Sequence, residues 1–202
     1  MMNKIIFIDT ETGGVNAEKS ALIQLSGIIE VDGTEKEKFN FYIKPFENSE
    51  LNEKALEVQG RTLEELETEK YIDESIIYKK FLEILDKYID KYDKNDKFIV
   101  AGYNVKFDID ILKALFERNN DKFLFSYFNS SMLDPLYSVR LLQVAGILPV
   151  LENNKLETWC KYFNIELKAH DSLQDITATK KLIEKLIELI KGQWQLNSNC
   201  DL

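Results

Sequence analysis

The chain has 202 residues, of which 45% are hydrophobic and 11% aromatic, so it can form one globular domain with a sizeable core and is not a disordered protein. Its 35 acidic residues against 26 basic ones give a net charge of −9, which provides no electrostatic footprint for long duplex nucleic acid, a ligand that usually needs basic stripes. Chemistry at nucleic-acid ends stays open, because bound divalent cations can supply positive charge themselves.

No apolar run reaches the roughly 20 residues of a membrane span, and the passage from Met-Met-Asn-Lys into the first strand pattern leads us to expect no signal peptide. The two cysteines, Cys160 and Cys200, lack the spacing of a metal site. These features together predict a cytoplasmic protein that does not contact a membrane.

The first half of the chain begins with strand patterns. Residues 4–9 form a short β-branched apolar run, residues 21–31 a second run, and residues 39–43 a third, with the turn signal Asp32-Gly33 between the last two. Three consecutive strands with short turns predict an antiparallel meander. Residues 49–58 and 75–92 then change to a helical pattern, the second with a clear 3.6-residue period.

The second half alternates strands and helices. Strands are expected at residues 98–102 and 132–133, and helices at residues 107–118, 135–145, 156–163 and 172–190. The predicted fold is therefore α/β, with a mixed five-stranded sheet, antiparallel meander first and parallel strands after, flanked by helices. One domain is expected over residues 1–191. Residues 192–202 read as a polar C-terminal tail, either a frayed terminus or a peptide that docks on a partner.

Carboxylates follow the first strand at Asp9 and Glu11. Alternate strand residues point to the same side, so both side chains can converge at the carboxyl end of the strand. An aspartate after Ile-Ile-Phe-Ile is costly to bury unpaired, which favours a compensating cation. The alternative is a turn cap, since Asp9 also precedes Thr12-Gly13.

Further polar groups stand at two strand-to-helix junctions. Asn104 and Asp108 follow the fourth strand, where open α/β sheets place their sites. His170 and Asp175 flank the start of the last helix. The structural alternatives are dipole complementarity for Asp108 and a buried structural role for His170.

Four acids and one histidine at three such junctions form a hard, oxygen-rich cluster. Such a cluster suits two Mg²⁺ or Mn²⁺ ions and does not suit zinc. His170 is the only histidine of the chain, and its side chain has a pKa near neutrality, so it is the natural general base.

These residues carry a resemblance. Asp9-x-Glu11, Asn104-x-x-Phe107-Asp108 and His170-x4-Asp175 resemble the three motifs of the DEDDh, or DnaQ-like, 3′→5′ exonuclease superfamily. The superfamily includes the proofreading epsilon subunit of bacterial DNA polymerase III, ribonuclease T and oligoribonuclease. The similarity runs from about residue 4 to residue 190 and implies a ribonuclease H-like fold.

The resemblance also implies the roles of the five residues. Asp9 would bridge two divalent cations, Glu11 and Asp175 would complete one ion, Asp108 would hold the second, and His170 would accept a proton from the attacking water. The substrate would contact Thr12, the turn at Val58 and Gln59, and the segment with Asn104 and Phe107.

The sequence departs from the family pattern on the substrate side. In Val58-Gln59-Gly60-Arg61-Thr62, Gln59 replaces a histidine and Arg61 an isoleucine, and Tyr103 replaces a histidine before the asparagine. These departures put substrate preference in doubt and leave the metal ligands intact.

The expected function is metal-dependent 3′→5′ hydrolysis of single-stranded nucleic acid to nucleoside 5′-monophosphates, with DNA favoured. The partners would be a single-stranded 3′ end and a DNA polymerase or another replication or repair protein. One alternative is an exoribonuclease of the oligoribonuclease or ribonuclease T kind. The other is a non-catalytic module that binds nucleic-acid ends or a polymerase, which would not need five such groups.

Overall fold

Six strands form one mixed sheet in the order β4-β3-β2-β1-β5-β6. The computed structural model describes residues 3–167 and 171–198, with side chains described up to residue 192. The strands are β1 (Lys4–Thr12), β2 (Leu22–Val31), β3 (Thr34–Lys44), β4 (Ile72–Asp73), β5 (Phe98–Ala101) and β6 (Phe128–Leu133). β1, β2 and β3 pair antiparallel, whereas β5 pairs parallel to both β1 and β6. The predicted meander followed by parallel strands is confirmed.

The sheet has one more strand than the five predicted. β4 is only two residues long and pairs in parallel with the end of β3, where Ile43 and Ile72 are partners. Two residues carry no periodicity, so a sequence pattern cannot reveal such a strand.

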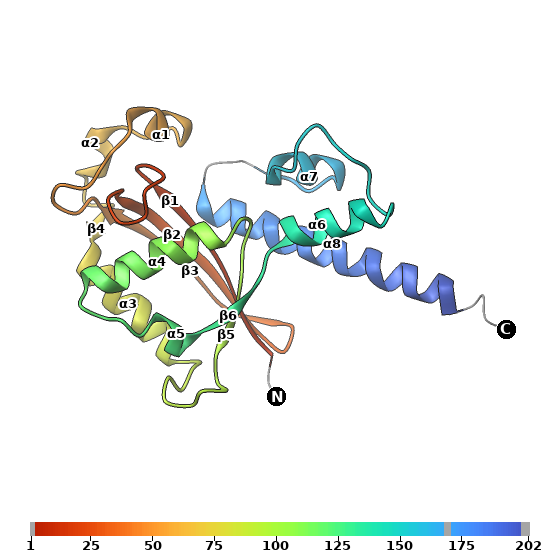
Figure 1. Cartoon of the computed structure of the whole chain (residues 1–202). Coiled ribbons are helices and arrows are strands. Elements are labelled where there is room, and N and C mark those ends of the chain that lie inside the picture. The colour runs from red at the N-terminus through yellow and green to blue at the C-terminus, as the bar shows by residue number, and fades with distance from the viewer. Residues whose placement is uncertain (1–2, 168–170, 199–202) are drawn as a thin grey trace.

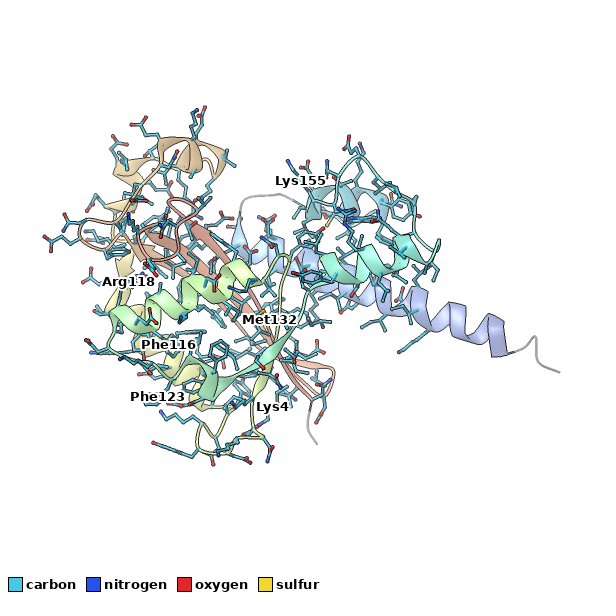
Figure 2. The ribbon with its side chains drawn as sticks, in the orientation of Figure 1. Lys4, Phe116, Arg118, Phe123, Met132 and Lys155 are labelled. Atoms are coloured by element: carbon cyan, nitrogen blue, oxygen red, sulfur yellow. The ribbon has the colours of Figure 1, made fainter. Side chains whose placement is uncertain are left out.

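Helices cover both faces of the sheet (Figure 1). They are α1 (Glu53–Val58), α2 (Leu63–Leu66), α3 (Glu74–Asp86), α4 (Lys106–Arg118), α5 (Leu124–Tyr127), α6 (Pro135–Val144), α7 (Leu156–Tyr162) and α8 (Ser172–Ser198). α3 and α4 pack the main core against one face, and Figure 2 marks Phe116 of α4 and Met132 of β6, which both belong to this packing. α8 packs on β1 and β2 at the other face, and α6 and α7 pack against α8.

The last helix is longer than the sequence predicts. α8 continues to Ser198, so the expectation that the helical pattern stops at about residue 190 is wrong. Gly192 costs only about 1 kcal/mol inside a helix, and the glutamines that follow are good helix formers. Adding residues to an existing helix is far easier than starting one, so the helix passes through the glycine. The domain boundary at residue 191 stays a prediction.

α3 ends earlier than predicted, at Asp86 rather than near residue 92. Turns follow it, and Ile89 is nevertheless buried there, which explains why the apolar period continued past the end of the helix. Among the described residues, no helix combines the length and the apolar character needed to cross a bilayer.

β1 is the central strand and extends past its parallel neighbour. Residues 5–7 pair with residues 99–101 of β5, and β5 then ends, while β1 continues to Thr12 paired only with β2. The last residues of β1 therefore stand at an open edge where the carboxyl ends of two parallel strands meet. This edge is the usual place for sites in open α/β sheets.

Candidate active site

Asp9 and Glu11 project from the part of β1 that has no neighbour on the β5 side. Alternate strand residues share a face, so the two carboxylates point the same way. One carboxylate oxygen each of Asp9, Glu11 and Asp175 lies within 4.8 Å of the other two, and all three residues are half-buried. The structure thus brings together three of the four predicted acids from opposite ends of the chain.

Asp175 reaches this cluster from the first turn of α8. The Asp175 N–H donates to the carbonyl of Asp171 at 2.9 Å, and the Gln174 N–H donates to the Asp171 side chain at 3.2 Å. Asp171 therefore closes the first turn of the helix, as aspartate commonly does at this place. Ser172 is fully buried, and its hydroxyl lies 2.6 Å from that of Ser26 on β2.

Asp108 enters from the first turn of α4 and is held by β1. Its Oδ1 accepts hydrogen bonds from the Thr10 backbone N–H at 2.9 Å and from the Thr10 hydroxyl at 2.7 Å. The chain between β5 and α4 comes so close to β1 that a Cβ on Gly102 would lie 2.7 Å from the Ile8 carbonyl oxygen. Only glycine fits there, and this close approach sets Asp108 beside the end of β1.

The carboxylates oppose one another's ionisation. Burial, followed by the nearby charges of Asp108, Asp175 and Glu11, raises the pKa of Asp9 well above its usual value. Burial and the charge of Asp175 raise the pKa of Glu11 to about 7, although the Arg61 guanidinium opposes the rise.

The buried Asp108 follows the same pattern, because loss of hydration raises its pKa to about 7 even though both Thr10 hydrogen bonds favour the ionised form. Clustered carboxylates with raised pKa values are the expected state of a metal site before a cation binds. All donors are carboxylate oxygens, which Mg²⁺ and Mn²⁺ prefer, so the residues fit the divalent cations that the sequence implies.

The remaining predicted residues line the rim or lie outside the described residues. The buried Thr12 donates through its hydroxyl to the Gly14 carbonyl at 2.6 Å, and its own carbonyl accepts from Gln59 Nε2 at 2.9 Å. Val58 is 59% exposed next to Gln59.

Asn104 is exposed with a φ of 56°, a left-handed conformation that asparagine tolerates, and the half-buried Phe107 packs partly against the main core. His170 lies outside the residues that the structure describes.

Two groups of residues at the site escaped the sequence analysis. Thr10 was overlooked because its neighbours Asp9 and Glu11 carry the motif, although it holds Asp108. Gln24 and Ser26 are polar residues two apart inside the apolar run of β2, and both are fully buried. Because alternate strand residues point to the same side, this spacing indicates a polar patch on one face of β2. The apolar pattern of the strand does not reveal it.

The comparisons with known proteins agree with this geometry. The RNase T family model, described as an exonuclease, matches residues 6–183. Ribonuclease T of Photorhabdus laumondii is 26% identical over 97% of this chain and 90% of its own length. The PolC-type DNA polymerase III of Bacillus cereus is also 26% identical, over 91% of this chain but only 11% of the polymerase.

A solved structure shows the same fold. E. coli exonuclease I in complex with a dT13 oligonucleotide superposes with a TM-score of 0.74 at 24% identity, covering 92% of this chain and 40% of that protein. Since the RNase T model spans nearly all of the described fold, including Asp9, Glu11, Asp108 and Asp175, this chain belongs to the RNase T family of exonucleases, within the DEDDh, DnaQ-like superfamily of 3′→5′ exonucleases.

Proposed function

We propose that this chain hydrolyses the last phosphodiester of single-stranded nucleic acid at its 3′ end and releases nucleoside 5′-monophosphates. Asp9, Glu11 and Asp175 would hold one divalent cation, and Asp9 with Asp108 would hold a second. The observation that carries the proposal is the convergence of three carboxylate oxygens within 4.8 Å at the open end of β1. A module that only binds nucleic acid would gain nothing from carboxylates that repel both one another and the phosphates.

In this mechanism the chain mainly positions groups. Thr10 holds the Asp108 carboxylate beside the end of β1 by its two hydrogen bonds. His170 would accept the proton of the attacking water, as the resemblance implies for the histidine of the third motif. Bound Mg²⁺ or Mn²⁺ would supply water activation and neutralise charge at the phosphate. The turn with Val58 and Gln59, docked on the Thr12 carbonyl, would contact the terminal nucleotide.

DNA and RNA are both candidate substrates. The similar E. coli exonuclease I is bound to a dT13 oligonucleotide, and PolC-type DNA polymerases are among the relatives, which supports DNA. Ribonuclease T relatives, matched over nearly their full length, support RNA as the second candidate. Association with a DNA polymerase or another replication or repair protein, and a cytoplasmic location, belong to the same proposal.

The test is a degradation time course on DNA and RNA oligonucleotides of one sequence, each labelled at the 5′ end, with Mg²⁺ or Mn²⁺. A ladder that shortens from the 3′ end and disappears with EDTA is expected, and the faster substrate identifies the preferred sugar. Asp9→Ala should abolish both cation binding and cleavage. Cleavage by the wild-type protein in EDTA, or at internal positions first, would contradict the proposal.

A further inference from the structure

A buried polar network joins the sheet to the start of α8 beneath the carboxylates. Gln24 and Ser26 share one face of β2, and both are fully buried. Gln24 Nε2 donates to Asp171 Oδ2 at 3.3 Å, and the Ser26 hydroxyl meets that of Ser172 at 2.6 Å. Both β2 side chains also donate to Asn40 Oδ1 on β3, at 2.8 and 2.9 Å. Burying hydrogen-bonded polar groups contributes little more stability than burying apolar groups of the same size. The network therefore serves to fix the position of α8 on the sheet.

The orientation of the Gln24 amide is fully determined by its partners. Its nitrogen gives one proton to Asn40 and the other to Asp171, and its oxygen accepts from the Arg61 guanidinium. A primary amide has two donor protons, and each of them has an acceptor here. Rotating the amide by a half-turn would set its nitrogen against a guanidinium that can only donate. Gln24 therefore has one allowed position.

Arg61 is itself held firmly at the end of α1. The Arg61 N–H donates to the Leu56 carbonyl at 2.9 Å, and the Gly60 N–H donates to the Glu57 carbonyl at 3.0 Å, with Gly60 at a φ of 66°. This is a Schellman cap, which needs glycine at the left-handed position. The guanidinium carbon lies 5.6 Å from the centre of the Tyr42 ring.

Gln24 stands between the two segments that carry the clustered carboxylates. It is the cross-strand partner of Glu11 in the register of β1 and β2. Its hydrogen bond to Asp171 reaches the first turn of α8, where the Asp171 carbonyl accepts the N–H of Asp175. One amide thus links β2, the strand paired with the one that bears Glu11, to the turn that bears Asp175.

We propose that Gln24 is a positioning residue, which fixes the first turn of α8 through Asp171 and so sets Asp175 against Glu11. The inference rests on the proposed function, because the distance between these carboxylates matters only if they hold cations. A shift of about 1 Å in a catalytic group can cost about 100-fold in rate. Loss of the link should therefore lower turnover and cation affinity much more than stability.

The test reverses the direction of this one hydrogen bond. Gln24→Glu keeps the size and the acceptor for Arg61, but it places a carboxylate oxygen against both Asn40 Oδ1 and Asp171 Oδ2. The Asn40 amide can rotate by a half-turn and donate to the new carboxylate, whereas the Asp171 carboxylate has no proton to donate. Asp171→Asn alone either places its new amide nitrogen against Gln24 Nε2 or, if the amide rotates, turns its oxygen away from the Gln174 N–H. In the double variant the new amide at position 171 can donate to the new carboxylate at position 24, while asparagine still caps the helix. The double variant also restores the net charge of the wild-type site.

Turnover, KM, Mn²⁺ affinity and the melting temperature are measured for all four proteins. Each single variant should lose about 10-fold to 100-fold in kcat, with KM within about threefold of wild type and weaker Mn²⁺ binding. The double variant should exceed the product of the two single effects by about tenfold or more in kcat and in Mn²⁺ affinity. The control Tyr78→Phe removes a partly buried hydrogen bond to Asp121 on the opposite face of the sheet and should leave kcat unchanged.

Two outcomes would overturn the inference. Independent effects in the double variant would mean that Gln24 and Asp171 do not act through one bond. Single variants that melt earlier but keep kcat and Mn²⁺ affinity would assign Gln24 a structural role only. A wild-type protein that binds Mn²⁺ and cleaves nothing would refute the proposed function instead, and the Mn²⁺ titrations of the four proteins would still test the link.

Discussion

Replacing Glu11 with glutamine should stabilise the protein in the absence of metal and weaken its response to metal. The pKa of Glu11 in the folded chain is about 7, against an ordinary value of 4.5. An acid whose pKa is raised on folding contributes stability below its unfolded pKa, and this contribution is lost as the pH rises through its folded pKa. Above pH 7 the ionised Glu11 thus destabilises the folded state, whereas a glutamine at this position never ionises.

The size of the effect follows from the pKa. A tenfold change in proton affinity corresponds to about 1.4 kcal/mol, so the rise from 4.5 to about 7 gives an upper limit of about 3 kcal/mol. Glu11 is only half-buried, and water screens part of this cost, so about 1–2 kcal/mol is expected. For a chain of this length that corresponds to a melting temperature higher by roughly 3–6 °C.

The assay is thermal unfolding in EDTA at pH 8 and at pH 4.5, followed by circular dichroism. Glu11→Gln should melt higher than wild type at pH 8, and the gap should shrink at pH 4.5. Saturating Mn²⁺ should raise the melting temperature of the wild type and raise that of the variant much less. Glu83→Gln, an exposed position on α3, is the matched control and should change neither value. Equal melting temperatures of Glu11→Gln and wild type at pH 8 would refute the electrostatic reasoning.

Three further predictions concern protons and hydrogen bonds at the site. Mn²⁺ affinity should rise with pH up to about 7, and Mn²⁺ binding should release protons, because Glu11 and Asp108 must ionise to bind the cation. Calorimetry in two buffers of different ionisation enthalpy detects the released protons. A binding enthalpy that does not depend on the buffer would contradict the prediction. Thr10→Val removes the 2.7 Å hydroxyl bond to Asp108 and should weaken Mn²⁺ binding at pH 7 by about tenfold, a defect that must shrink at pH 9 if it reflects the pKa of Asp108. His170→Ala should lower kcat by about two to four orders of magnitude while Mn²⁺ still binds, and intact turnover would mean that another group is the base.

The strands of the sheet could be predicted from the sequence for a definite reason. The strands of the meander and of β5 are apolar runs bounded by turns, and local patterns of that kind survive tertiary packing. Asp9, Glu11, Asp108 and Asp175 stand at a strand end or in first helical turns, where open α/β sheets place their sites. Their meeting point follows from the parallel pairing of β1 with β5, which brings the carboxyl ends of both strands to one edge of the sheet.

The details that position these acids could not be predicted in the same way. The bond from Thr10 to Asp108 joins residues 98 apart in the chain, and the bond from Gln24 to Asp171 joins residues 147 apart. No periodicity encodes such pairs, because they depend on how α4 and α8 settle on the sheet. The sequence shows only that Gln24 and Ser26 interrupt the apolar run in the first half of β2.

The described carboxylates Asp9, Glu11 and Asp108 form no ion pair with a basic side chain, and this has a consequence for metal binding. A lysine or arginine paired with these carboxylates would lower their pKa values, but it would also compete with a cation for the same oxygens. Among the described residues, no basic side chain forms an ion pair with Asp9, Glu11 or Asp108. Arg61 comes near but gives its hydrogen bond to the amide oxygen of Gln24. The carboxylates thus stay repulsive and available, so the free energy that a divalent cation gains by binding includes relief of that repulsion.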